Sequence, residues 1–223
     1  MATEQTPATS GEKNEKKFDF AKNQNVILGA LAAVLVLVIA FVGYQQYYLP
    51  TQNLEAQDAI FGAQEAFKAG KFNEALNGEV PNYVGFLAVA NDYGSTQTGK
   101  LAHYYAGLSY LNLGDFDNAI AQLQQFDGDD LLIGAYALGA LGDAYAEKGD
   151  MEKAIQYYKD AANHSENELS TPAFLLKSAL ALESKGNNKE AFEQLTKLDK
   201  NYPNFNAPSM DVETHLARLE QKQ

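Results

Sequence analysis

The sequence contains no cysteine and only three histidines, at positions 103, 164 and 215. Without cysteine the chain has no disulfide, no thiolate nucleophile and no thiolate metal ligand, which is compatible with an oxidising or a reducing compartment. The histidines are scattered, and no HExxH, P-loop, GxGxxG or GxSxG motif is present. The sequence therefore predicts no catalytic residue, no metal or cofactor site and no small-molecule substrate.

Basic residues are also scarce, with 17 Lys and Arg against 29 Asp and Glu. Beyond residue 48 there are 13 basic and 25 acidic side chains. Such a surface repels phosphate backbones, which argues against a nucleic-acid partner. Asp127, Asp129 and Asp130 form an acidic cluster, but the glycine and glutamate spacing of an EF-hand is missing, so we expect a solvated turn.

Charged residues are absent from the stretch 23–53, and residues 26–42 are apolar throughout. Together with Gly43 and Tyr44, this run is about as long as a helix that spans hydrocarbon. Tyr47 and Tyr48 follow it, where aromatic residues meet the membrane interface. The alternative is a cleaved signal peptide, but the apolar run is longer than a usual signal-peptide core. We therefore predict a transmembrane anchor at residues 23–48.

The orientation of this anchor follows from its lysines. Four precede it, Lys13, Lys16, Lys17 and Lys22, whereas the next basic residue after it is Lys68. Basic residues remain on the cytoplasmic side, so we predict a cytoplasmic N-terminus. Residues 1–22 are polar and are expected to be a disordered tail, and residues 49–223 are expected outside the cytoplasm.

A repeat dominates the second half of the chain. Its residues recur 35 positions apart, pairing Gly107, Tyr110, Gly114, Phe116 and Ala119 with Gly142, Tyr145, Gly149, Met151 and Ala154. A period in the thirties indicates paired helices stacked into a solenoid. The run Leu138-x2-Leu141-Gly142-x2-Tyr145 resembles the tetratricopeptide repeat (TPR), with leucine in place of its tryptophan. His103 occupies the corresponding position of the preceding repeat, and we interpret it as structural.

We predict an all-α fold, with the transmembrane helix followed by a right-handed TPR solenoid of about four repeats. The repeats are expected near residues 55–93, 100–131, 135–166 and 172–203, with a capping helix at 211–221. The first repeat is degenerate, and the stretch after its second helix predicts a loop followed by a helix near residues 83–93.

The TPR resemblance implies that the first helix of each repeat lines a concave groove. The predicted partner-binding residues are Tyr104, Leu108, Asn112, Tyr136, Asp143, Glu147, Leu176, Leu180 and Glu183. The same family positions also include Leu101, Leu111, Gly139, Ala146, Ala173 and Ser184. We expect Asp143 and Glu147 to be exposed on one stripe with Tyr136, so that lysine at both acidic positions costs only ~0.5 kcal/mol of stability. The mixed apolar and acidic groove favours a basic or amphipathic peptide.

The order of a cytoplasmic tail, one anchor and an exported TPR domain resembles the YfgM family, over residues 20–205. Stretches such as DAIFGAQEAF and LGDAYAEKGDMEKAIQYY are similar to TPR proteins of this layout from Bacteroidetes. The resemblance implies a non-enzymatic adaptor in the bacterial inner membrane that links the SecYEG translocon to periplasmic chaperones. A scaffold for division or outer-membrane-export machinery has the same layout and stays an alternative, as does, less favoured, a membrane-tethered enzyme.

Overall fold

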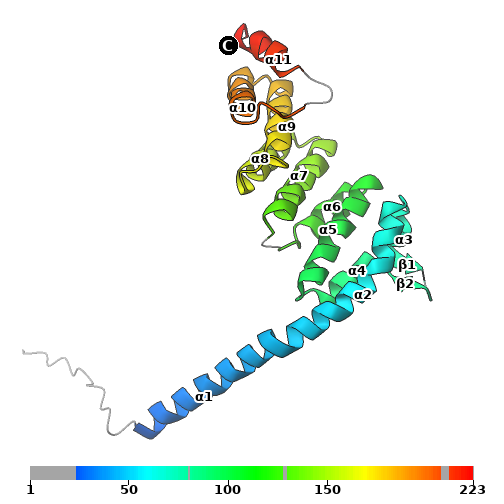
Figure 1. Cartoon of the computed structure of the whole chain (residues 1–223), viewed down its shortest axis with the longest axis vertical. Coiled ribbons are helices and arrows are strands. Elements are labelled where there is room, and N and C mark those ends of the chain that lie inside the picture. Colours follow the sequence, from blue (N-terminus) through cyan, green and yellow to red (C-terminus); the bar gives the residue numbers. More distant parts are fainter. Residues whose placement is uncertain (1–23, 80, 128–129, 207–210, 223) are drawn as a thin grey trace, which may run out of the picture. The chain divides into compact units, whose positions relative to one another are not determined.

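The computed structural model describes residues 24–79, 81–127, 130–206 and 211–222, and they divide into two units, one ending at Tyr47 and one beginning at Tyr48. The predicted tail, residues 1–22, lies outside the described residues. The fold is helical, as predicted, with one small hairpin as its only described sheet (Figure 1).

The first unit is built on α1 (Gln24–Gly43), followed by a π-helical segment, η1 (Tyr44–Tyr48). No residue of α1 is buried, and apolar side chains such as Val26 and Leu37 are exposed. Among the described residues, one helical run (Gln24–Lys68) is long and apolar enough to cross a membrane, with a mean hydropathy of 3.0 in its most apolar part. Because burying such a surface in hydrocarbon is favourable, α1 is consistent with a transmembrane helix.

The second unit is an α-solenoid of successive helix pairs. Its elements are α2 (Leu49–Lys68), α3 (Phe72–Asn77), β1 (Gly78–Glu79), β2 (Tyr83–Val84), α4 (Phe86–Tyr93), α5 (Gln97–Asn112), α6 (Phe116–Leu123), α7 (Leu131–Glu147), α8 (Met151–His164), α9 (Thr171–Ser184), α10 (Asn188–Asn201) and α11 (Val212–Glu220). Each helix from α5 to α10 packs on the helices before and after it. Figure 1 shows this stack from green to orange.

The turns inside the helix pairs are built by a recurring glycine and the cap that follows it. Gly149 has a φ of +81°, in the left-handed region that favours glycine, and Asp150 then accepts a hydrogen bond from the backbone N–H of Lys153. The equivalent positive-φ glycines are Gly70, Gly114 and Gly186. Asp115 and Asn187 are the corresponding caps of α6 and α10. The repeated turn therefore has the same chemistry in three pairs.

Small residues allow the paired helices to cross closely. A Cβ on Gly107 would lie 2.5 Å from Cγ of Leu123, and one on Gly142 would lie 2.5 Å from Cε1 of Tyr158. Ala119 and Ala154, from the second helices, are fully buried. The residues that define the repeat in the sequence are thus the residues at the crossings.

The first repeat departs from the later ones. Within the stretch predicted as a loop, β1 and β2 pair as an antiparallel hairpin in which Gly78 faces Val84 and Glu79 faces Tyr83. Gly78 has a φ of +83°, and a Cβ there would lie 2.6 Å from the backbone N of Gly85, so the tight approach needs glycine. The helix expected near residues 83–93 follows as α4.

At the other end, α11 lies within the range predicted for a capping helix. Leu219 of α11 is fully buried in the last hydrophobic core, beside Leu195 and Leu198 of α10. Leu216 and Val212 pack against the same core from the side of α11. This helix covers apolar surface that the last helix pair would otherwise leave in water.

Candidate functional site

Two adjoining clefts lie along the C-terminal parts of α5, α7 and α9, and we call them the first and the second cleft. The first has a volume of about 490 Å³ and is lined by Leu111, Asn112, Gly114, Phe116, Asp143, Ala146, Glu147, Tyr158 and Lys177. The second has a volume of about 310 Å³ and is lined by Ala146, Met151, Tyr158, Lys177, Leu180, Ala181 and Ser184. Ala146, Tyr158 and Lys177 belong to both, so the clefts are neighbours.

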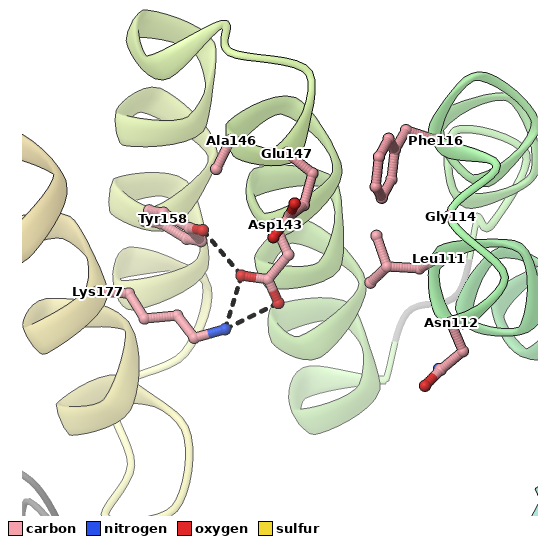
Figure 2. A pocket seen from close by; sticks show the side chains of 9 residues that line it. All are labelled: Leu111, Asn112, Gly114, Phe116, Asp143, Ala146, Glu147, Tyr158 and Lys177. Carbon is pink, nitrogen blue, oxygen red and sulfur yellow. Dashed lines mark hydrogen bonds and ion pairs between the residues drawn. The ribbon is translucent and has the colours of Figure 1, made fainter.

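Asp143 of α7 is the most strongly bonded side chain of the first cleft. The Nζ atom of Lys177 donates to both carboxylate oxygens, at 2.7 and 2.8 Å, and the hydroxyl of Tyr158 donates to Oδ1 at 2.8 Å (Figure 2). Asp143 and Lys177 are 33% and 43% exposed. Lys177 therefore neutralises the carboxylate where α7, α8 and α9 meet.

The pKa of Tyr158 is shifted by the same surroundings. Burial, and secondly the negative charge of Asp143, raise the pKa of its phenol well above the ordinary value. The Nζ atom of Lys177 also lies 5.6 Å from the centre of the Tyr158 ring. The ring and the carboxylate therefore both interact with this ammonium group.

Glu147, one turn after Asp143, is different. It is exposed, and within the part of the chain that the structure describes it has no hydrogen bond or ion pair. Figure 2 shows Phe116 and Leu111 on the opposite side of the cleft from Asp143 and Glu147. The first cleft thus combines one unpaired carboxylate with an apolar wall.

The comparisons with known proteins concern these same helices. Residues 104–168 match a tetratricopeptide repeat family, and residues 173–204 match a second one. The chain contains TPRs. All residues that line the two clefts fall within the two matched ranges.

Solved structures give the same fold. The chain is similar to crystal structures of the nearly identical TPR-like repeats of a Podosopora anserina kinesin light chain and of a single-substitution variant of those repeats. For each the TM-score is 0.54 at 16% identity, over 75% of this chain and 86% of the other. A comparison with curated proteins finds no match. At this identity the likeness establishes the fold alone.

The predicted TPR groove residues separate into two groups. Asn112, Asp143 and Glu147 line the first cleft, and Leu180 lines the second. All four lie late in their helices. Among the further family positions, Leu111 and Ala146 line the first cleft, and Ala146 and Ser184 line the second.

Positions earlier in the first helices are used for packing. Tyr104 lies against Phe126, with ring centres 5.8 Å apart, and burial followed by the nearby Tyr105 and Tyr136 raises its pKa to about 12. The ring of Tyr136 packs against Phe174, with ring centres 5.7 Å apart, and Tyr136 is not among the residues that line the first cleft.

The remaining predicted positions also make contacts within the repeats. Leu108 and Leu176 pack against the middle and the last hydrophobic core. Gly139, a further family position, is buried where the ring of Phe174 covers it.

Two of the predicted acidic groove residues, Glu183 and Asp143, are not free to pair with a partner, because each is held by other side chains. Glu183, whose side chain is only 17% exposed, pairs with Arg218 of α11 and with Lys222, at 2.8 and 3.6 Å. The expectation that Asp143 is exposed is also wrong, since its carboxylate is partly buried and bonded to two side chains. Of the three predicted acidic groove residues, Glu147 alone keeps an unpaired carboxylate among the described residues.

The remaining polar candidates have structural contacts. Nδ1 of His103 lies 2.8 Å from Oε1 of Gln122. Asp130 caps α7 by accepting from the backbone N–H groups of Leu132 and Ile133, and Asp127 pairs with Lys100 at 3.4 Å. Asp129 lies outside the described residues. In the described parts of the chain, no group of three or more His, Asp or Glu side chains is arranged to hold a metal ion.

Proposed function

We propose that this chain is a membrane-anchored TPR adaptor that captures protein partners in its two clefts. The clefts carry the proposal, because their lining includes groove positions that the TPR resemblance implies, and because the first cleft sets an unpaired carboxylate opposite an apolar wall. TPR folds are interaction scaffolds, and we assign no catalytic role.

The anchor is the second part of the proposal. Residues 23–48 span the bacterial inner membrane, with the N-terminus in the cytoplasm and the TPR domain in the periplasm. The exposed apolar surface of α1 supports the span, and the four lysines before it support this orientation. By its resemblance in layout to the YfgM family, we propose that the adaptor joins the SecYEG translocon to periplasmic chaperones.

The topology is tested with reporters on the full chain. A reporter that is active only outside the cytoplasm should work when fused after Gln223, and one that is active only in the cytoplasm should work at Met1. Replacing Lys13, Lys16, Lys17 and Lys22 with uncharged residues should scramble the orientation, since no nearby basic residue replaces them. Uniform, unchanged insertion of that variant would contradict the orientation.

The partners are tested by affinity purification in mild detergent. One form carries the native anchor, and a control form carries an unrelated single span in place of residues 23–48, so both remain in the membrane. Recovery of SecYEG with the native anchor only supports the translocon link. Recovery of division or export components in its place favours the alternative scaffold. Leu180→Arg, which blocks the second cleft, should reduce the recovery of soluble periplasmic partners in both forms.

A further inference from the structure

The two clefts are the same site one repeat apart, with different chemistry. Along the repeat period, Leu111 corresponds to Ala146 and Phe116 to Met151. Between this repeat and the following one, Asp143 corresponds to Leu180, and Glu147 to Ser184. Equivalent positions in a solenoid line successive parts of one surface. An extended chain lying along this surface would therefore meet the first cleft and then the second.

The first cleft has the features of a cation site. Lys177 already neutralises Asp143, so the charge that remains for a ligand is the carboxylate of Glu147. Phe116 faces it from the other side of the cleft, and this ring is not among the residues packed into the three hydrophobic cores (Figure 2). A carboxylate opposite an aromatic ring suits a guanidinium group, which pairs with one and stacks on the other.

The second cleft has no free carboxylate. Met151, Leu180, Ala181 and Ala146 make most of its lining, and Leu180 is 43% exposed. Its charged lining residue, Lys177, is held by Asp143. An apolar side chain placed there would remove the exposed surface of Leu180 from water.

We propose that the groove binds an extended peptide segment that places an arginine in the first cleft and a large apolar side chain in the second. This inference rests on the proposed function and adds the chemistry of the partner. Charge complementarity supports this occupant, because the chain has a net charge of −12 and a basic segment is attracted to it. The same charge disfavours a second copy of the chain as occupant.

The proposal is tested with the full chain in lipid nanodiscs and fluorescently labelled probe peptides. Each probe is a short Gly/Ser peptide with one arginine and one leucine, and the set varies the distance and order of the two residues. At the best spacing, we expect lysine in place of arginine to weaken binding roughly threefold. Serine in place of leucine should weaken it about tenfold, and glutamate in place of arginine should abolish it.

Three variants assign these preferences to the clefts. Glu147→Gln should weaken the arginine probe about fivefold at low salt and less at high salt. Phe116→Leu should remove the preference for arginine over lysine, and Leu180→Ser should remove the preference for leucine over serine. The matched controls are Glu193→Gln on α10 and Phe61→Leu on α2, which make the same changes at exposed sites outside the clefts. Circular dichroism confirms that each variant is folded.

Two outcomes would overturn the inference. One is that no probe shows a preference for arginine and leucine, and the other is that the preferences persist in the cleft variants. If Leu180→Arg still reduces partner recovery in either case, the clefts capture proteins of another chemistry and the proposed function stands. If the probes behave as expected but Leu180→Arg leaves partner recovery unchanged, the proposed function fails and the peptide chemistry stands.

Discussion

The two sides of α7 use neighbouring residues for opposite purposes. On the crossing side, Gly142 accepts the ring of Tyr158 at a distance that leaves no room for a side chain, and Ala154 is fully buried beside it. On the cleft side, Asp143 and Glu147 line the first cleft. The crossing residues recur from repeat to repeat, whereas the cleft residues change. In this solenoid, the repeated residues build the helix crossings, and the residues that vary give each cleft its own chemistry.

The strongest test of this comparison is an overpacked crossing. Ala154→Arg should lower the free energy of unfolding by more than about 4 kcal/mol, because it forces a long charged side chain into a fully buried site. Gly107→Leu should act in the same direction, since its first carbon already meets Leu123. Thermal or chemical unfolding followed by circular dichroism measures both. A melting temperature within a few degrees of the parent would show that the repeat register is wrong.

The next largest effect on stability is expected from a change of Asp143, which lines the first cleft and also accepts a hydrogen bond from Tyr158. Asp143→Lys should lower the free energy of unfolding by about 2 kcal/mol, because it removes the acceptor of Tyr158 and places a like charge beside Lys177. Asp143→Asn is the milder control, since it keeps an acceptor and removes only the charge. Equal stability of the lysine variant and the parent would contradict the bonded role of Asp143.

Asp143 also shows how far the sequence can predict this molecule. The period of the repeat predicts the crossings and turns, because Gly142, Gly149 and Ala154 serve contacts within one helix pair and recur with it. The salt bridge to Lys177 joins different repeats, and a pattern within one repeat contains no signal for it. Phe116 was missed as a lining residue for a related reason, since it begins a second helix while the family positions describe first helices.

The same limit applies at the end of the chain. Glu183 occupies a groove position by its place in the repeat, but α11 brings Arg218 and Lys222 onto it. This pairing depends on where the capping helix turns back, which the repeat period does not specify. The existence of the capping helix was predictable from its pattern, whereas its effect on the charge of the groove required the fold.

A smaller effect on stability is expected from removing the hydroxyl of Tyr158, which donates a hydrogen bond to Asp143. Tyr158→Phe keeps the ring against Gly142 and removes the hydrogen bond to Asp143, so the free energy of unfolding should fall by about 1 kcal/mol at neutral pH. The folded pKa of Tyr158 is raised, so the protonated phenol contributes stability below the ordinary value of 10.0 and this contribution is lost as the pH rises above it. The variant should therefore lose less stability than the parent between neutral pH and alkaline pH, as measured by urea unfolding across that range.

The smallest effect on stability is expected from a change of Glu147, which lines the first cleft and takes no part in the helix crossing. Glu147→Lys should change the free energy of unfolding by only ~0.5 kcal/mol, because the side chain is exposed and has no ion pair within the described residues. Its effect on binding should be much larger, since it places a positive charge where the cleft presents its unpaired carboxylate. Titration with a basic peptide at low and high ionic strength measures this, and the loss should shrink as salt screens both forms.

The matched control is Glu193→Lys on α10, which makes the same charge change outside the clefts. If the folded Glu147 variant binds as tightly as the parent at both ionic strengths, the clefts are not the binding surface, and variation between repeats at these positions does not specify the ligand.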